Sequence, residues 1–153
     1  MVMQRISEDG FLSDAELHGF IQEACATMPT DNRRVLFIIP DHTRSMPMPL
    51  VFRALFDALH GRVKRMDYLI ALGTHPPMTE EMINRLVGVT PEERAGKYLD
   101  IGIFNHAWQD PASLACIGIL SEAEIDRISG GLMKQSVEVT INRRVLELSL
   151  IHI

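Results

Sequence analysis

Residues 66–81 read MDYLIALGTHPPMTEE, an apolar run followed at once by a turn that carries one histidine. The run Met66–Leu72 suits a strand that is buried on both faces, as central strands of parallel sheets are. Gly73 lets the backbone turn, and the two prolines after His75 restrict its freedom. Thr79 then predicts the start of a helix, with glutamates in the first turn where negative charge suits the helix dipole. The stretch therefore predicts a strand, a rigid turn that carries His75, and a helix.

A second stretch, VLFIIPDHTR at residues 35–44, repeats the arrangement of an apolar run followed by polar side chains. The run Val35–Ile39 is apolar on both faces, and the amphipathic pattern of residues 51–59 predicts a helix after it. In a parallel sheet the carboxyl ends of neighbouring strands meet at one edge, and ligands bind there. We therefore expect the loop at residues 41–44 and the turn at His75 to converge.

The rest of the chain continues the alternation of helices and strands. Residues 13–16, SDAE, form a capping box that predicts a helix ending near Met28. Another helix is expected from Thr90, with Pro91 in its first position. Further strands are expected at residues 101–104, 114–120 and 137–141, and a last helix from Asn142. This order predicts an α/β three-layer domain, Rossmann-like, with a mostly parallel sheet and helices on both faces.

One glycine pair resembles a phosphate-binding loop only superficially. It lies in the segment SGGLMK, residues 129–134. The segment lacks the Gly-Lys-Ser/Thr end that places a lysine on phosphates. A loop with glycine hinges is therefore expected there.

The length and composition fit one soluble domain. The chain has 153 residues, 46% of them hydrophobic, which is enough for a substantial core. The net charge of −5 argues against nucleic acid or an anionic membrane as a partner. No apolar run approaches the ~18 residues of a membrane span and no signal peptide opens the chain, so we expect a cytoplasmic protein. Cys25 and Cys116 lack metal-like spacing and are expected to be buried free thiols.

His75 is the strongest candidate for proton transfer. An imidazole titrates near neutral pH, so it can accept or donate a proton without large tuning. Rigid placement matters because a shift of about 1 Å can cost on the order of 100-fold in rate. The alternative is an ordinary histidine on a surface loop.

Arg44 is the candidate for binding an anion. Its guanidinium offers a fork that matches carboxylate or phosphate, and Asp41 nearby can fix the direction of the fork. The alternative is an Asp–Arg pair that closes a surface turn. His42 is expected to point away from both, and His106 either packs in its loop or lines the same edge. None of these residues has the close ligand spacing typical of zinc sites, so no metal ligand is expected among them.

Two motifs together resemble the nickel-dependent lactate racemase family, specifically its N-terminal domain. They are Asp41-His42-Thr43-Arg44 and Gly73-Thr74-His75-Pro76-Pro77-Met78-Thr79-Glu80-Glu81, with weaker matches at Asn105-His106 and Val139-Thr140-Ile141-Asn142-Arg143. The resemblance covers most of residues 35–147. It implies an enzyme that racemises or epimerises a small-molecule 2-hydroxy acid, either lactate or a related acid.

The resemblance also implies a cofactor and roles for the motif residues. The cofactor is a nickel pincer nucleotide, a modified pyridinium mononucleotide that accepts the substrate's hydride. His75 is then one of two acid/base histidines and takes the proton of the substrate hydroxyl. Asp41, His42, Thr43 and Arg44 line the cofactor and substrate region. Arg44 binds an anion there, which is either the cofactor phosphate or the substrate carboxylate.

Two departures from the family pattern bear on the substrate. Ser45 follows Arg44 where lactate racemases tend to have proline. Pro76 follows His75 where they tend to have arginine. The missing arginine weakens the case for lactate and leaves other 2-hydroxy acids open.

The end of the chain predicts an incomplete domain. In the family, the second histidine, the cofactor-anchoring lysine and the nickel-binding histidine all follow the segment that matches Asn142-Arg143, where this chain has only about ten residues. Residues 1–147 are therefore predicted to be a partial N-terminal domain, and residues 148–153 a non-native, adapter-derived tail. The chain alone is expected to be inactive. The alternative is a non-enzymatic α/β module that binds an anionic small molecule through Arg44.

Overall fold

The computed structural model describes residues 3–8 and 10–147. These residues form two compact units, one up to Asn105 and one from His106 onward. The tail expected at residues 148–153 lies outside the described residues. Within the described ranges, no helix has the length and apolar character needed to cross a membrane.

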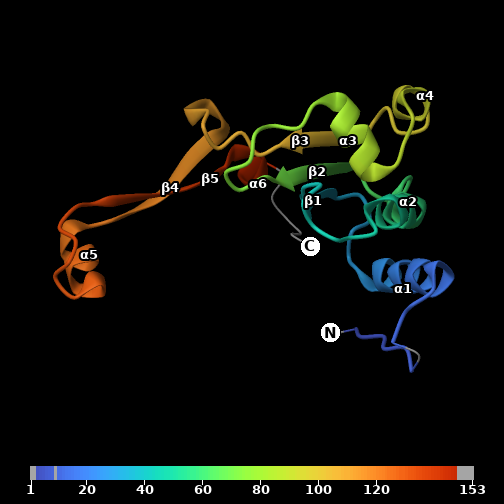
Figure 1. Ribbon diagram of the computed structural model, residues 1–153, viewed down its shortest axis with the longest axis horizontal. Coiled ribbons are helices and arrows are strands. Elements are labelled where there is room, and N and C mark those ends of the chain that lie inside the picture. The colour runs from blue at the N-terminus through green and yellow to red at the C-terminus, as the bar shows by residue number, and fades with distance from the viewer. Residues whose placement is uncertain (1–2, 9, 148–153) are drawn as a thin grey trace. The chain divides into compact units, whose positions relative to one another are not determined.

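The first unit alternates strands and helices along the chain. Its elements are α1 (Asp14–Thr27), β1 (Arg34–Pro40), α2 (Met48–Leu59), β2 (Arg65–Ala71), α3 (Glu80–Val87), α4 (Pro91–Ala95) and β3 (Gly102–Asn105). The three strands lie side by side and parallel in the order β1-β2-β3 (Figure 1). The predicted α/β class and parallel sheet are confirmed.

One face of this sheet carries an aromatic core. Phe37 of β1 pairs in register with Tyr68 of β2, which pairs with Ile103 of β3. Helix α2 adds Phe52, whose ring centroid lies 5.2 Å from that of Tyr68 and 5.1 Å from that of Tyr98. All five side chains are buried. Because large aromatic side chains dominate the energetics of a small core, the sheet is a firm base for the loops at its edge.

A glycine allows α3 to pack closely against the start of α2. Gly88 ends α3 with a φ of 68°, in the left-handed region. A Cβ atom added there would lie 2.5 Å from Cβ of Pro49. The carbonyl of Gly88 accepts a 2.6 Å hydrogen bond from Nη2 of Arg53, which also belongs to α2. Both the backbone conformation and the close approach therefore require glycine.

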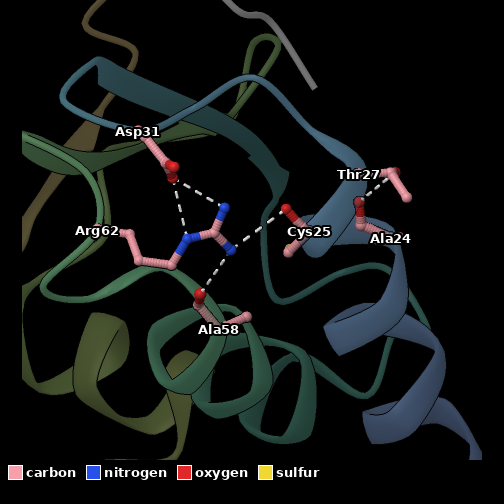
Figure 2. Close-up of polar contacts among 6 residues, drawn as sticks. All are labelled: Ala24, Cys25, Thr27, Asp31, Ala58 and Arg62. Atoms are coloured by element: carbon pink, nitrogen blue, oxygen red, sulfur yellow. Dashed lines mark hydrogen bonds and ion pairs between the residues drawn. The ribbon is translucent and has the colours of Figure 1, made fainter.

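Arg62 joins the ends of α1 and α2. As Figure 2 shows, its Nε and Nη2 atoms both donate to Oδ1 of Asp31, at 3.0 and 2.9 Å. Its Nη1 atom donates to the carbonyl oxygens of Cys25 and Ala58, at 3.4 and 3.3 Å (Figure 2). These carbonyls lie in the last turns of the two helices, where the regular helical hydrogen bonds run out, although the carbonyl of Cys25 also accepts from the N–H of Met28 at 3.3 Å. Arg62 therefore caps two helices at once.

The second unit is built around a two-stranded antiparallel sheet. Its elements are η1 (Pro111–Ser113), β4 (Leu114–Leu120), α5 (Glu122–Ser129), β5 (Val137–Asn142) and α6 (Arg143–Glu147). The strands β4 and β5 were predicted, but they pair with each other and not with the parallel sheet. An antiparallel partner needs only a direct return of the chain, whereas a parallel partner needs a crossover connection.

Two details of the second unit differ from the sequence predictions. The helix α5 was not predicted, although Ser121 and Glu124 form a capping box like that of Ser13 and Glu16. The glycine-hinge loop expected after Ser129 is in part the C-cap of this helix, because Gly130 has a φ of 64° and ends it. Cys116 is exposed and not buried as expected, because the middle of β4 is open to solvent.

Candidate functional site at the carboxyl edge of the parallel sheet

The two polar loops meet around one hollow at the carboxyl ends of β1 and β2. The hollow has a volume of about 460 Å³ and is lined by residues of two segments, 38–44 and 71–75. The register explains this arrangement, because Pro40, the last residue of β1, pairs with Ala71, the last residue of β2. Asp41 and His75 follow these two residues closely. The hollow therefore forms where parallel α/β sheets bind ligands.

Asp41 and His75 are hydrogen-bonded across this edge. Nδ1 of His75 lies 2.5 Å from Oδ2 of Asp41. The Asp41 side chain is only 4% exposed, whereas that of His75 is 50% exposed. The buried carboxylate therefore holds an imidazole ring whose other half faces solvent.

Thr43 keeps the Asp41 carboxylate ionised. Its hydroxyl and its backbone N–H both donate to Oδ1 of Asp41, at 2.5 and 3.0 Å. The hydroxyl of Thr43, and after it the ring of His75, lower the pKa of Asp41 well below its usual range. A carboxylate without a proton can only accept, so Nδ1 of His75 is the donor in this pair. In the neutral ring, Nε2 then carries the lone pair and can accept a proton.

The backbone of the histidine turn is held at two points. The N–H of His75 donates to the carbonyl of Leu72 at 3.0 Å, across Gly73 with its φ of 59°. Further on, the side chain of Asn105 accepts from the N–H of Met78 at 3.0 Å and donates to its carbonyl at 2.9 Å. This two-bond clamp ties the turn to the end of β3. The sequence analysis does not predict this clamp, although Asn105 belongs to one of the weaker motif matches.

Arg44 lines the same hollow but does not pair with Asp41. Its backbone N–H donates to the carbonyl of Asp41 at 3.3 Å, which closes the turn between them. Among the described residues, no ion pair joins its guanidinium to a carboxylate, and the Asp41 carboxylate instead accepts from Thr43 and His75. The expectation that Asp41 fixes the Arg44 fork is therefore wrong. An exposed guanidinium beside the hollow is instead available to an anionic ligand.

The other predicted residues lie elsewhere. His42 is exposed and does not line this hollow, but a second one of about 280 Å³. His106 belongs to the second unit, where its Nδ1 atom lies 3.1 Å from Nδ2 of Asn142. In the described part of the chain, no group of three His, Cys, Asp or Glu side chains is placed to hold a metal ion.

The chain is similar to known proteins in sequence and in fold. Among curated proteins, no match is found. A crystal structure of a Thermotoga maritima protein, solved as a structural genomics target, superposes with a TM-score of 0.73 at 24% sequence identity. The match covers 89% of this chain and 31% of that chain, so this chain spans about a third of its length and shares its fold. The model of the lactate racemase N-terminal domain matches residues 14–152. The chain therefore belongs to the lactate racemase N-terminal domain family.

Proposed function

We propose that this chain supplies one acid/base and the substrate anchor of a racemase or epimerase of 2-hydroxy acids. The observation that carries the proposal is the 2.5 Å contact between Nδ1 of His75 and Oδ2 of Asp41. It leaves Nε2 as the basic nitrogen of a half-exposed ring on the wall of a ligand-sized hollow. Family membership supports the same reaction class.

The roles of the three side chains follow from their contacts. Nε2 of His75 takes the proton of the substrate hydroxyl, while the hydride on the same carbon would go to the family's cofactor when it is bound, and the proton returns to the oxygen when the hydride returns to the carbon. Asp41 stabilises the imidazolium formed in between, since its own carboxylate remains ionised. Arg44 holds the substrate carboxylate through paired hydrogen bonds and so fixes the hydroxyl near the ring.

The family's cofactor, a nickel pincer nucleotide, is not accounted for by the described residues. The described part of the chain has no group of three His, Cys, Asp or Glu side chains placed to hold a metal ion by themselves. We therefore assign no nickel ligand to this chain and derive no step through the metal.

The second candidate is a non-enzymatic module that binds an anionic small molecule. The observation in its favour is the guanidinium of Arg44, which lines the hollow and pairs with no carboxylate among the described residues, so it would bind carboxylate or phosphate with or without a base nearby. The two proposals differ in their dependence on His75. Anion binding alone needs Arg44 and is insensitive to the protonation state of the histidine ring.

Racemisation of a 2-hydroxy acid by the cofactor-loaded protein that contains this chain tests the proposal. His75→Ala is expected to lower kcat by about 100-fold or more, because proton transfer by a placed side chain contributes roughly 10²–10⁴. His18→Ala is the matched control, since His18 lies in α1 and pairs with Asp57 at 3.6 Å, away from the hollow. Equal turnover of the two variants would refute the role of His75 and favour the binding module.

A further inference from the structure

A second hollow, of about 280 Å³, lies between the loop that follows β1 and the helix α3. Its wall is apolar and rich in methionine, with Met46, Met48, Met78, Met82 and Leu86 among its lining residues. Met48 and Met78 are buried and continue into the core, whereas Met46 and Met82 are accessible. Methionine is unbranched and polarizable, so such a wall adapts to apolar groups of different shape.

Arg44 lines both this hollow and the one that contains His75. Arg44 therefore lies between the hollow that contains His75, the proposed proton acceptor, and the hollow with the apolar methionine wall. The second hollow has another cation, Arg85, but its Nη2 atom is hydrogen-bonded to Glu81 at 3.0 Å. Of the two arginines that line this hollow, Arg44 is therefore the one without a carboxylate partner in the described part of the chain.

Resting on the proposed function, we infer that the methionine-lined hollow receives the side chain of the substrate, and that the preferred substrate is a 2-hydroxy acid with a branched aliphatic side chain. The α-carbon of such an acid carries a carboxylate, a hydroxyl and a side chain. With the carboxylate on Arg44 and the hydroxyl at His75, the side chain is left for the apolar wall.

The size of the hollow favours a side chain larger than the methyl group of lactate. A methyl group would leave most of the 280 Å³ to water, at roughly 30 Å³ for each molecule. An isobutyl group adds three carbons to the contact with the wall. Since each fully buried CH₂ group contributes roughly 0.8 kcal/mol, or about fourfold in affinity, partial burial of these carbons predicts a preference of about tenfold over lactate.

The inference can be tested by methyl NMR on the 153-residue chain labelled at the methionine methyl groups. The probes are lactate and 2-hydroxy-4-methylpentanoate, which differ only in the side chain. The larger acid is expected to bind about tenfold more tightly and to shift the methyl signals of Met46, Met78 and Met82. The signal of Met133, an exposed methionine of the second unit, should not move.

Two variants sharpen the test. Met82→Gln keeps the length of the side chain and its helix propensity but replaces the thioether by an amide. It is expected to reduce the preference for the larger acid to about twofold, since the amide costs affinity only for an apolar side chain. Met133→Gln is the matched control and should leave the tenfold preference unchanged.

Three outcomes would overturn the inference. They are equal affinities for the two acids in the unaltered chain, a preference that survives in Met82→Gln, and tighter binding of a dicarboxylic 2-hydroxy acid than of the branched one. These outcomes do not depend on turnover. A chain that binds the branched acid at the methionines but racemises nothing when loaded would refute the proposed function and leave the subsite standing.

Discussion

Replacing Asp41 by asparagine tests the proton arrangement at His75 directly. In the unaltered chain Asp41 accepts three hydrogen bonds, two from Thr43 and one from Nδ1 of His75. Asparagine offers one oxygen and one NH₂ group in nearly the same shape. If its oxygen takes the two donors of Thr43, its NH₂ group faces Nδ1 of the ring.

That geometry forces the imidazole into its other neutral tautomer. Nδ1 must then accept, so the proton moves to Nε2, and the lone pair that faces the hollow is lost. The opposite orientation of the amide is disfavoured because it would set the NH₂ group against the N–H of Thr43, 3.0 Å from the present oxygen. We therefore expect kcat to fall by the full contribution of a placed base, on the order of 10²–10⁴.

Two measurements check this expectation. Nitrogen-15 NMR of the imidazole reports which ring nitrogen carries the proton, and it needs neither cofactor nor substrate. Turnover of the cofactor-loaded protein reports the catalytic consequence. Thr43→Val serves as the control, because it removes one donor to Asp41 but leaves its contact with the ring, so the tautomer should be retained.

The reasoning fails if Asp41→Asn leaves the proton on Nδ1 of His75. It also fails if the tautomer changes while kcat stays within about threefold of the unaltered enzyme, since a placed base contributes far more than that. In the second case Nε2 of His75 is not the group that accepts the proton.

Three further predictions follow from the contacts around the site. Asn105→Ala removes the bonds of 3.0 and 2.9 Å to Met78. At about 1 kcal/mol net for each bond, the free energy of unfolding in urea should fall by about 2 kcal/mol, and amides near Met78 should exchange faster with solvent; unchanged exchange would contradict the clamp. Gly88→Ala should lower the melting temperature more than Gly61→Ala, because both glycines have positive φ, at 68° and 82°, but only at Gly88 does an added Cβ meet another atom at 2.5 Å. A left-handed backbone alone costs roughly 1–2 kcal/mol, so equal losses would refute the packing argument. Finally, since the folded-state pKa of Asp41 is depressed, its stabilising effect is complete above the ordinary value of about 4 and is lost as the pH falls toward the depressed value. The difference in unfolding free energy between the unaltered chain and Asp41→Asn should therefore shrink from about pH 5 to about pH 3, and a constant difference would count against it.

Local signals in the sequence were sufficient for most elements of the first unit. The apolar runs before Asp41 and before Gly73 are long enough for buried strands, and each is followed by helix-starting residues. Such signals depend only on neighbouring residues along the chain, so they can be interpreted without any knowledge of tertiary contacts. The capping box at Ser121 is an equally local signal, so the helix α5 that begins there could have been predicted in the same way.

Pairing between segments that are distant in the sequence could not be predicted from such local signals. That β4 and β5 pair with each other is decided by which edges are free, and no local pattern shows this. The hydrogen-bond partner of Asp41 is also not shown by any local pattern, because the sequence offers two candidates. Arg44 is three residues away and carries the opposite charge, whereas His75 is 34 residues away. The strand register brings His75 to the carboxylate, and the turn directs Arg44 away from it.

The pairing of Asp41 with His75 bears on how the proposed enzyme would select its substrate. Because Asp41 is committed to His75, the acid/base pair is fixed by the ends of two buried strands, and its geometry depends on the sheet. The apolar wall of the second hollow is instead supplied in part by Met82 and Leu86, on the helix α3. On the proposed subsite, we therefore expect substitutions on α3 to change which substrate side chain is accepted without moving the pair formed by Asp41 and His75. If the proposed subsite is correct, the side chain of the substrate is selected at the methionines, and not at Pro76, the position where lactate racemases tend to have arginine.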